Sequence, residues 1–194
     1  MNHTINICLI PSWEIYDTCI KLNSFDKSTY NDNSRDYIPH ITLGMKTLSW
    51  EQVQSLYEDI QKLKLQKQTS SILWYYAKKI APWDVWTGIS IEKTDWLHWL
   101  QKVVLELSEK YESQERNKNT YAIDNFYEEN EIRFFPESEY LARDSFHITL
   151  WKQDIQTEYN KQEIPEQLRF EKLVIWKIWN YGSVREVLFE IDLE

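Results

Sequence analysis

The tetrapeptide His-Ile-Thr-Leu occurs twice in the chain, starting at His40 and at His147, which are two of only four histidines. In an extended strand, alternate side chains share a face. Each copy therefore places its histidine with a threonine, Thr42 or Thr149, and its isoleucine with its leucine on the opposite face. Two imidazoles near neutral pH can act as base and acid on opposite sides of a phosphorus atom. Two hydroxyls can hydrogen-bond the non-bridging oxygens as negative charge develops there.

The same alternation extends beyond each tetrapeptide. It places Gly44 on the face of His40 and Met45 on the opposite face, and it places Trp151 on the face of His147. A nucleobase could stack on Trp151, since stacking on an aromatic side chain contributes roughly 1–3 kcal/mol per base. A tryptophan buried in the core is the alternative, and the sequence leaves both interpretations open.

An Arg-Asp pair precedes each tetrapeptide, Arg35-Asp36 before the first and Arg143-Asp144 before the second. A guanidinium group can bind phosphate through two parallel hydrogen bonds. Both arginines are therefore candidate substrate-binding residues. The alternative is a surface arginine that pairs with the aspartate beside it.

The sequence predicts neither a metal site nor a cofactor. Neither tetrapeptide carries a second metal ligand at close spacing. His98 follows Asp95 by three residues in an expected helix, but a surface or capping pair is the commoner role for that spacing. Cys8 and Cys19 lie in apolar surroundings, and we expect both to be free and buried.

The chain has 194 residues and a formal net charge of −9. An acidic protein repels the phosphate backbone, so no long nucleic acid is expected as a partner. A small nucleotide remains possible, because a few local donors in a cleft can outweigh a distant field. We find no secretory signal and no segment near the ~20 apolar residues that span a bilayer. A cytoplasmic protein without membrane contact is expected, and its oligomeric state stays open.

Hydrophobic periodicity predicts an alternation of strands and helices. The helix from residue 49 opens with Ser49 and Gln52 at the spacing of a capping box. The polar segment 113–144 is a candidate lid or substrate loop, because a connection of this length usually has a function. Strands are predicted over 4–10, 40–46, 70–80, 83–92, 146–152, 167–180 and 184–193, and helices over 12–22, 49–65 and 94–113.

The two HITL copies resemble the paired His-x-Thr/Ser motifs of the two-histidine phosphoesterases, the 2′-5′ RNA ligase-like superfamily. "IPHITL" is similar to the first motif of that family, "VWTGISIEKTDWLHWLQKVV" to its strand-then-helix middle, and "KLVIWKIWNYGSVREVLFEIDL" to its closing hairpin. Phe146 stands where a proline is common, and 113–144 has no counterpart. The resemblance implies one bilobal α/β (α+β) domain over 1–194, with two antiparallel sheets, helices outside and a pseudo-twofold axis through a central cleft.

The activity that the resemblance implies is a metal-independent phosphodiesterase that uses both histidines and both threonines. Suitable substrates are a 2′,3′-cyclic phosphate, a 2′-5′-linked oligoadenylate or a cyclic oligonucleotide signal, and cleavage of such signals would counter nucleotide-based immunity. One rival is an RNA-end processing or ligase-like enzyme of the same family. Another is a module that sequesters nucleotides without turnover. A third is an aromatic-rich interaction protein in which the repeated tetrapeptide is coincidence.

Overall fold

A computed structural model describes residues 2–23, 38–81, 84–111, 145–150, 164–178 and 184–194. The segment 113–144, which the sequence suggests as a lid, lies outside the described residues. The elements follow the predicted order: β1 (Asn2–Pro11), α1 (Trp13–Asn23), β2 (Ile41–Ser49), α2 (Trp50–Gln61), β3 (Thr69–Ala81), β4 (Asp84–Glu92), α3 (Asp95–Glu109), β5 (Ser145–Leu150), β6 (Gln167–Ile178) and β7 (Val184–Asp192). None of these helices is long and apolar enough to span a membrane.

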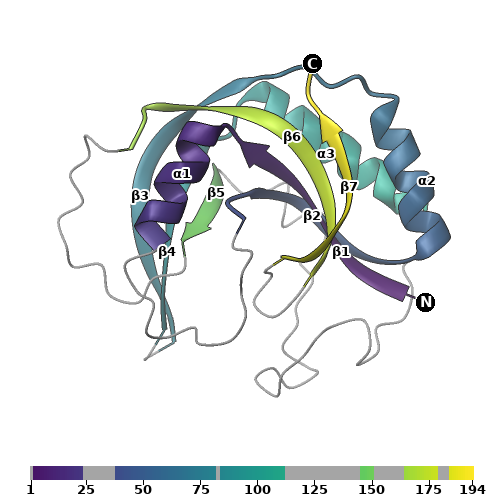
Figure 1. Cartoon of the computed structure of the whole chain (residues 1–194), viewed down its shortest axis with the longest axis horizontal. Helices are drawn as coiled ribbons and strands as arrows, with labels where there is room; N and C mark the ends of the chain where they lie inside the picture. Colours follow the sequence, from purple (N-terminus) through teal and green to yellow (C-terminus); the bar gives the residue numbers. More distant parts are fainter. Residues whose placement is uncertain (1, 24–37, 82–83, 112–144, 151–163, 179–183) are drawn as a thin grey trace.

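The strands form one curled antiparallel sheet in the order β2-β1-β6-β3-β4-β5, with β7 paired to β6 (Figure 1). Within this single sheet, two groups of strands, β2-β1-β6-β7 and β3-β4-β5, correspond to the two antiparallel sheets that the resemblance implies. A short ladder joins them, in which Thr69–Ser71 of β3 pairs with Gln167–Arg169 of β6. The two HITL strands, β2 and β5, are therefore the two ends of the path.

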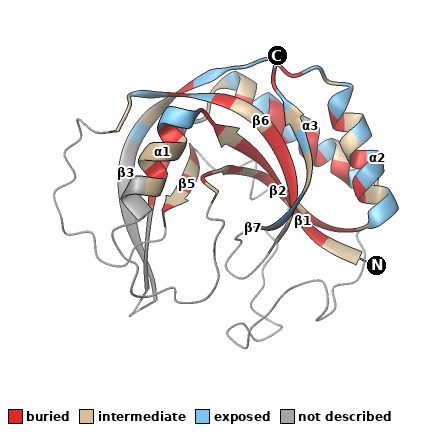
Figure 2. Ribbon diagram, in the orientation of Figure 1, coloured by how far each residue is buried: buried red, intermediate tan, exposed pale blue. Residues whose placement is uncertain are grey.

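The main hydrophobic core takes buried residues from all three helices and from β1, β2, β4, β5 and β6, and partly buried residues of β3 and β7 pack against it. β1 shows the alternation clearly, since Ile5, Ile7 and Leu9 are buried in this core, while Cys8 belongs to a second, smaller cluster on the other side. Figure 2 shows that the buried residues of β1 continue into β6 and onto the inner faces of the helices. The helices cover one side of the curled sheet, so its apolar side is removed from water and its other side is left for polar residues.

A β-bulge interrupts the pairing of β1 with β2. Ile7 is opposite Gly44 and the next residue, Cys8, is opposite Thr42, so Leu43 has no partner on β1. A bulge inserts one extra residue into one strand and shifts the alternation of side chains beyond it. Residues of β2 on either side of Leu43 therefore follow different registers.

The bulge reverses the predicted directions of two side chains. Gly44 faces α3, where an added Cβ would lie 2.9 Å from Leu105 Cδ2. Met45 is opposite Asn6, on the side where Asn6 hydrogen-bonds Thr42. The prediction for Gly44 and Met45 was wrong because it assumed a regular strand, whereas the extra residue moves glycine to the helix-facing side.

Two hydrogen bonds join α3 to β2 near the point where the helix closely approaches Gly44. Gln101 Nε2 donates to the carbonyl of Leu43, the bulged residue, at 3.3 Å. Lys46 Nζ donates to the carbonyl of Ser108 at 2.6 Å, near the end of the helix, and lies 3.5 Å from Glu109 Oε1. A lysine here suits both the last helical carbonyls and the negative end of the helix dipole. The helix starts are also fixed, and the predicted capping box of Ser49 and Gln52 is present.

Gly44→Val tests the reversed direction of this residue. Three carbon atoms would have to fit between β2 and α3, so we expect the free energy of unfolding to fall by about 1–3 kcal/mol. The matched control is Met45→Val, which places the same side chain at the neighbouring, half-buried position and should cost clearly less. Urea denaturation of both variants measures the difference. Equal costs at the two positions would contradict the bulge.

Candidate active site

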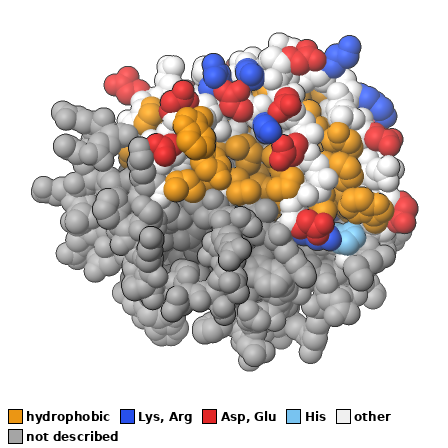
Figure 3. Space-filling view, viewed as in Figure 1, with side chains coloured by type: hydrophobic (Ala, Val, Ile, Leu, Met, Phe, Trp, Pro, Cys, Tyr) orange, Lys and Arg blue, Asp and Glu red, His pale blue; other side chains and the backbone are white. Residues whose placement is uncertain are grey.

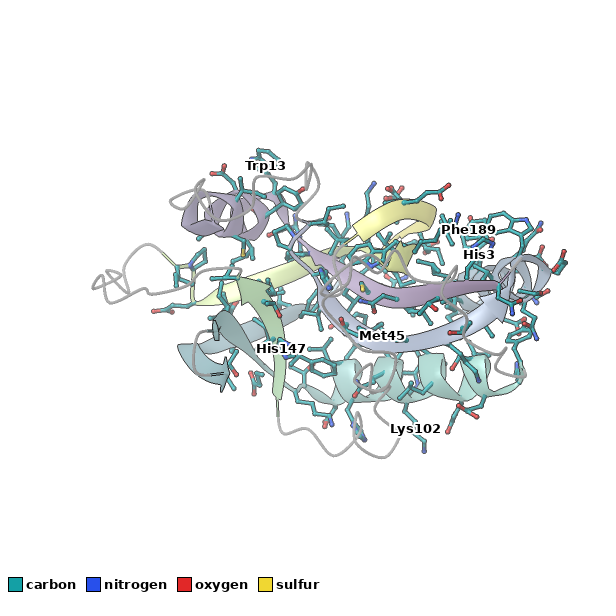
Figure 4. The ribbon with its side chains drawn as sticks, turned by 90° about the horizontal axis from the view of Figure 1, so that it is seen from below. His3, Trp13, Met45, Lys102, His147 and Phe189 are labelled. Atoms are coloured by element: carbon teal, nitrogen blue, oxygen red, sulfur yellow. The ribbon has the colours of Figure 1, made fainter. Side chains whose placement is uncertain are left out.

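The two HITL strands lie next to each other in space, although they are far apart in the sequence. The sheet curls so that residues of β2 and β5 approach within 8 Å between Cα atoms. The isoleucines and leucines of both copies belong to the same core: Ile41, Leu43, Ile148 and Leu150. Figure 4 shows His147 on β5 and Met45 on β2 from the underside of the sheet. The tertiary structure thus unites the strands that carry the candidate catalytic residues.

His40 lies immediately before β2 and is half-buried. Its Nδ1 is 2.7 Å from the carbonyl oxygen of Ile38. Because a carbonyl oxygen only accepts, Nδ1 carries the hydrogen of this bond, and Nε2 of the neutral ring keeps its lone pair. The ring also meets Trp176 edge to face, with centroids 4.6 Å apart and planes at 89°. These two contacts fix both the orientation and the tautomer of the imidazole.

Burial lowers the pKa of His40 from its usual 6.5 to about 4, and the hydrogen bond to Ile38 opposes this shift. The ring keeps some contact with solvent, but the surrounding protein displaces much of the bulk water that would stabilise an imidazolium. Part of that protein is the small cluster of Cys8, Val174 and Trp176, which Ile38 also contacts. His40 is therefore neutral at neutral pH.

Thr42 is held by two side chains of β1. Asn6 Nδ2 donates to Thr42 Oγ1 at 3.1 Å. Cys8 is the register partner of Thr42 and also hydrogen-bonds its side chain. Burial raises the pKa of the Cys8 thiol well above its usual value, although the bond to Thr42 opposes this. Cys8 is thus a protonated thiol at neutral pH.

The second copy lies within β5, where His147 pairs with Ser90 and Thr149 pairs with Gly88 of β4. His147 and Thr149 are half-buried, between the buried residues Phe146, Ile148 and Leu150. This alternation of exposure is the one that the sequence predicts for the HITL strand. The structure therefore gives both copies a polar face opposite the core.

Some polar residues of the site were missed by sequence analysis. Four buried side-chain atoms have no hydrogen-bond partner in the part of the chain that the structure describes: Asn6 Oδ1, Ser90 Oγ, Gln101 Oε1 and Trp176 Nε1. Asn6 and Trp176 are register partners on β1 and β6, and Ser90 is the partner of His147. An asparagine within the apolar run "TINICLI" was the one available signal, since buried polar side chains are rare without a role.

The remaining candidates fall into two groups. Arg35, Arg143 and Trp151 lie outside the described residues, so their predicted roles remain predictions. His98 is exposed on α3. Among the described residues, no group of three His, Cys, Asp or Glu side chains could hold a metal ion. Cys8 and Cys19 are free and buried, as predicted.

Comparison with solved structures identifies the fold. The E. coli LigT structure with 3′-AMP matches with a TM-score of 0.58 at 11% identity, covering 100% of this chain and 99% of that one. LigT with NADP⁺ and a structure described as a phosphoesterase each match with a TM-score of 0.58 at 14% identity, again covering 100% and 99% of the two chains. The chain has the two-histidine phosphoesterase fold. No family model matches the sequence, and no curated protein matches it.

This fold is the one that the repeated tetrapeptide predicted. At 11–14% identity, the likeness to these structures concerns the path of the chain and not its side chains. The prediction could nevertheless be made from the sequence, because it rests on the two tetrapeptides and the order of elements and not on overall identity. The match extends over the whole chain, and the antiparallel sheet with its three described helices agrees with the predicted α+β class.

His40→Gln tests the electrostatic environment of this site. The folded protein binds the His40 proton more weakly than the unfolded chain does, because the pKa falls from 6.5 to about 4 on folding. Stability should therefore be lost as the pH falls from about 6.5 to about 4. Over this range, the free energy of unfolding of the wild type should fall more steeply than that of His40→Gln, as measured by urea denaturation. Parallel curves would contradict the lowered pKa.

Proposed function

We propose that this protein is a metal-independent phosphodiesterase that cleaves a phosphodiester bond in a small nucleotide or oligonucleotide. The observation that carries the proposal is the meeting of two distant HITL strands through one core, on a two-histidine phosphoesterase fold. A binding module has no need of two proton-transfer groups, whereas phosphodiester cleavage uses a base and an acid. His40, Thr42, His147 and Thr149 are the proposed catalytic residues.

The surroundings of His40 support the role of general base. Its Nδ1 hydrogen is engaged by the Ile38 carbonyl, so Nε2 of the neutral ring is the available proton acceptor. The lowered pKa keeps this ring neutral at the pH of the cell. His147 is then the general acid, which protonates the leaving oxygen. In this scheme, the attacking water or ribose hydroxyl gives its proton to His40 as its oxygen forms the new bond to phosphorus.

The two threonines are proposed to stabilise the transition state. Their hydroxyls would donate to the non-bridging oxygens of the phosphate, where charge accumulates during the displacement. A hydrogen bond to a charged oxygen is stronger than one between neutral groups. Arg35 and Arg143 are proposed to add further charge at the phosphate, and Trp151 to stack on a base.

A small substrate is favoured over long RNA. The net charge of −9 opposes binding of an extended phosphate backbone. LigT, which shares the fold, has been crystallised with 3′-AMP, with ATP and with NADP⁺. We propose 2′,3′-cyclic phosphates, 2′-5′-linked oligoadenylates and cyclic oligonucleotides as the substrates to test, in the cytoplasm and without a membrane partner. A panel of these compounds, with turnover read by chromatography, tests the proposal directly.

Replacement of either histidine tests the acid–base pair. His40→Ala and His147→Ala should each lower kcat by roughly 10²–10⁴-fold, the usual contribution of a positioned acid or base. The double variant should be little worse than the worse single one, because residues that act as a unit are not additive. His98→Ala, on the exposed side of α3, is the control and should keep full turnover. Intact turnover in either single variant would overturn the mechanism, and wild-type binding without turnover would favour a sequestering module.

The pH dependence of kcat/KM tests which histidine is the base. In the free enzyme, a base with a pKa of about 4 gives a rate that rises with pH near 4, and the acid gives a falling limb at higher pH. If His40 were the acid instead, kcat/KM would fall as the pH rises through about 4. Circular dichroism at each pH provides the control that the protein remains folded.

A further inference from the structure

Asn6 is a fully buried polar residue in an otherwise apolar strand. Its exposed fraction is 0%, and its amide nitrogen donates to Thr42 Oγ1 at 3.1 Å. Its carbonyl oxygen has no hydrogen-bond partner among the described residues. Leaving a buried acceptor unpaired costs about 1–3 kcal/mol. The bond to Thr42 is therefore the one contact seen in the structure that accounts for an asparagine at this position.

The direction of this bond limits what Thr42 can do. A hydroxyl has one hydrogen to donate and two lone pairs to accept. Asn6 uses one lone pair. The contact with Cys8 lowers the pKa of that thiol, so in this contact the Thr42 hydroxyl donates to the sulfur, which is a weak acceptor. The Thr42 hydrogen does not go to Asn6 Oδ1, since that atom has no partner. A phosphate oxygen on the same side of the sheet as His40 is a stronger acceptor than the Cys8 sulfur and would take this hydrogen.

We infer that Asn6 is a positioning residue that holds the Thr42 hydroxyl as a hydrogen-bond donor toward a phosphate oxygen of the ligand. This inference rests on the proposed function, in which Thr42 contacts the phosphate. Asn6 does not itself reach the ligand, because its side chain is fully buried. A free threonine could rotate its hydrogen away and present a lone pair to the negatively charged phosphate. With one acceptor position occupied by Asn6, Thr42 would lose less rotational entropy when it donates.

The residues paired with the two threonines differ between the two HITL copies. Thr149 pairs with Gly88, which has no side chain to donate a hydrogen bond, whereas Thr42 pairs with Cys8. The bond from Asn6 to Thr42 is made in the His40 half of the site. It follows from the residues of β1, which the HITL tetrapeptide does not include.

A double-mutant cycle with 3′-AMP as the probe tests this inference. Isothermal titration calorimetry measures its Kd for the wild type, Asn6→Leu, Thr42→Val and the double variant. Asn6→Leu should weaken binding by about 3–10-fold, the range that corresponds to one hydrogen bond. In the Thr42→Val background, the same change should weaken binding by less than about 2-fold, because the group on which Asn6 acts is absent. Equal weakening in both backgrounds would overturn the inference.

The matched control is Thr4→Val. Thr4 lies two residues before Asn6 on β1, is also buried, and hydrogen-bonds Thr47 between their hydroxyls at 3.0 Å. Its replacement removes a buried hydrogen bond from the same strand and should leave 3′-AMP binding unchanged in both backgrounds. If Asn6→Leu fails to fold, Asn6→Ala, which also removes the amide donor, takes its place in the cycle. If Thr4 is coupled to Thr42 in 3′-AMP binding as strongly as Asn6 is, the specific role of Asn6 is overturned.

Turnover is measured separately, so that the two proposals can fail independently. If Asn6 and Thr42 are coupled in 3′-AMP binding but the protein cleaves no substrate, the proposed function is wrong and the positioning of Thr42 stands. Cleavage that depends on both histidines, with no coupling between Asn6 and Thr42, would overturn the positioning role alone. A wild type that does not bind 3′-AMP would overturn the phosphate contact on which this inference depends.

Discussion

Burial of the isoleucines and leucines of both HITL copies in one hydrophobic core is the constraint on which the rest of this structure depends. Ile41, Leu43, Ile148 and Leu150 come from opposite ends of the strand order, yet they belong to the same cluster. Removing such side chains from water stabilises the fold by roughly 1.5–3 kcal/mol each, which can favour a sheet that curls until its two ends meet. In β5 the alternation then leaves His147 and Thr149 on the opposite face, and in β2 it does the same for Thr42. The packing that buries the core side chains therefore also places the candidate catalytic groups.

The two copies have the same sequence but different environments, which is how one tetrapeptide can supply two chemical roles. His40 lies before its strand, with a backbone carbonyl on one nitrogen and a tryptophan edge against its ring. His147 lies inside its strand, opposite a serine. A pair of histidines with identical surroundings would have similar proton affinities, whereas acid–base catalysis works best when one is neutral and the other protonated.

The surface of the described part of the chain is mixed in character. Figure 3 shows hydrophobic side chains gathered over the middle of the face that it presents, with Lys, Arg, Asp and Glu around them. At one end, Phe189 stacks on Trp50 and on Tyr57, and His3 meets Trp50 edge to face. Figure 4 shows His3 beside Phe189, while Trp13 on α1 and Lys102 on α3 point away from the sheet. This aromatic group joins β1, α2 and β7, so much of the aromatic content there serves packing.

The sequence by itself determined the elements, their order, the capping box of α2 and, through the repeated tetrapeptide, the family of folds. These features depend on local periodicity and on a motif whose residues are adjacent in the chain. The tertiary structure alone decided the directions of Gly44 and Met45, because the bulge arises from pairing with β1. It also decided the environments of His40 and Thr42, since Trp176 approaches His40 and Asn6 approaches Thr42 from strands distant in sequence. Hydrogen bonds and desolvation depend on neighbours in space, and the linear sequence does not display those neighbours.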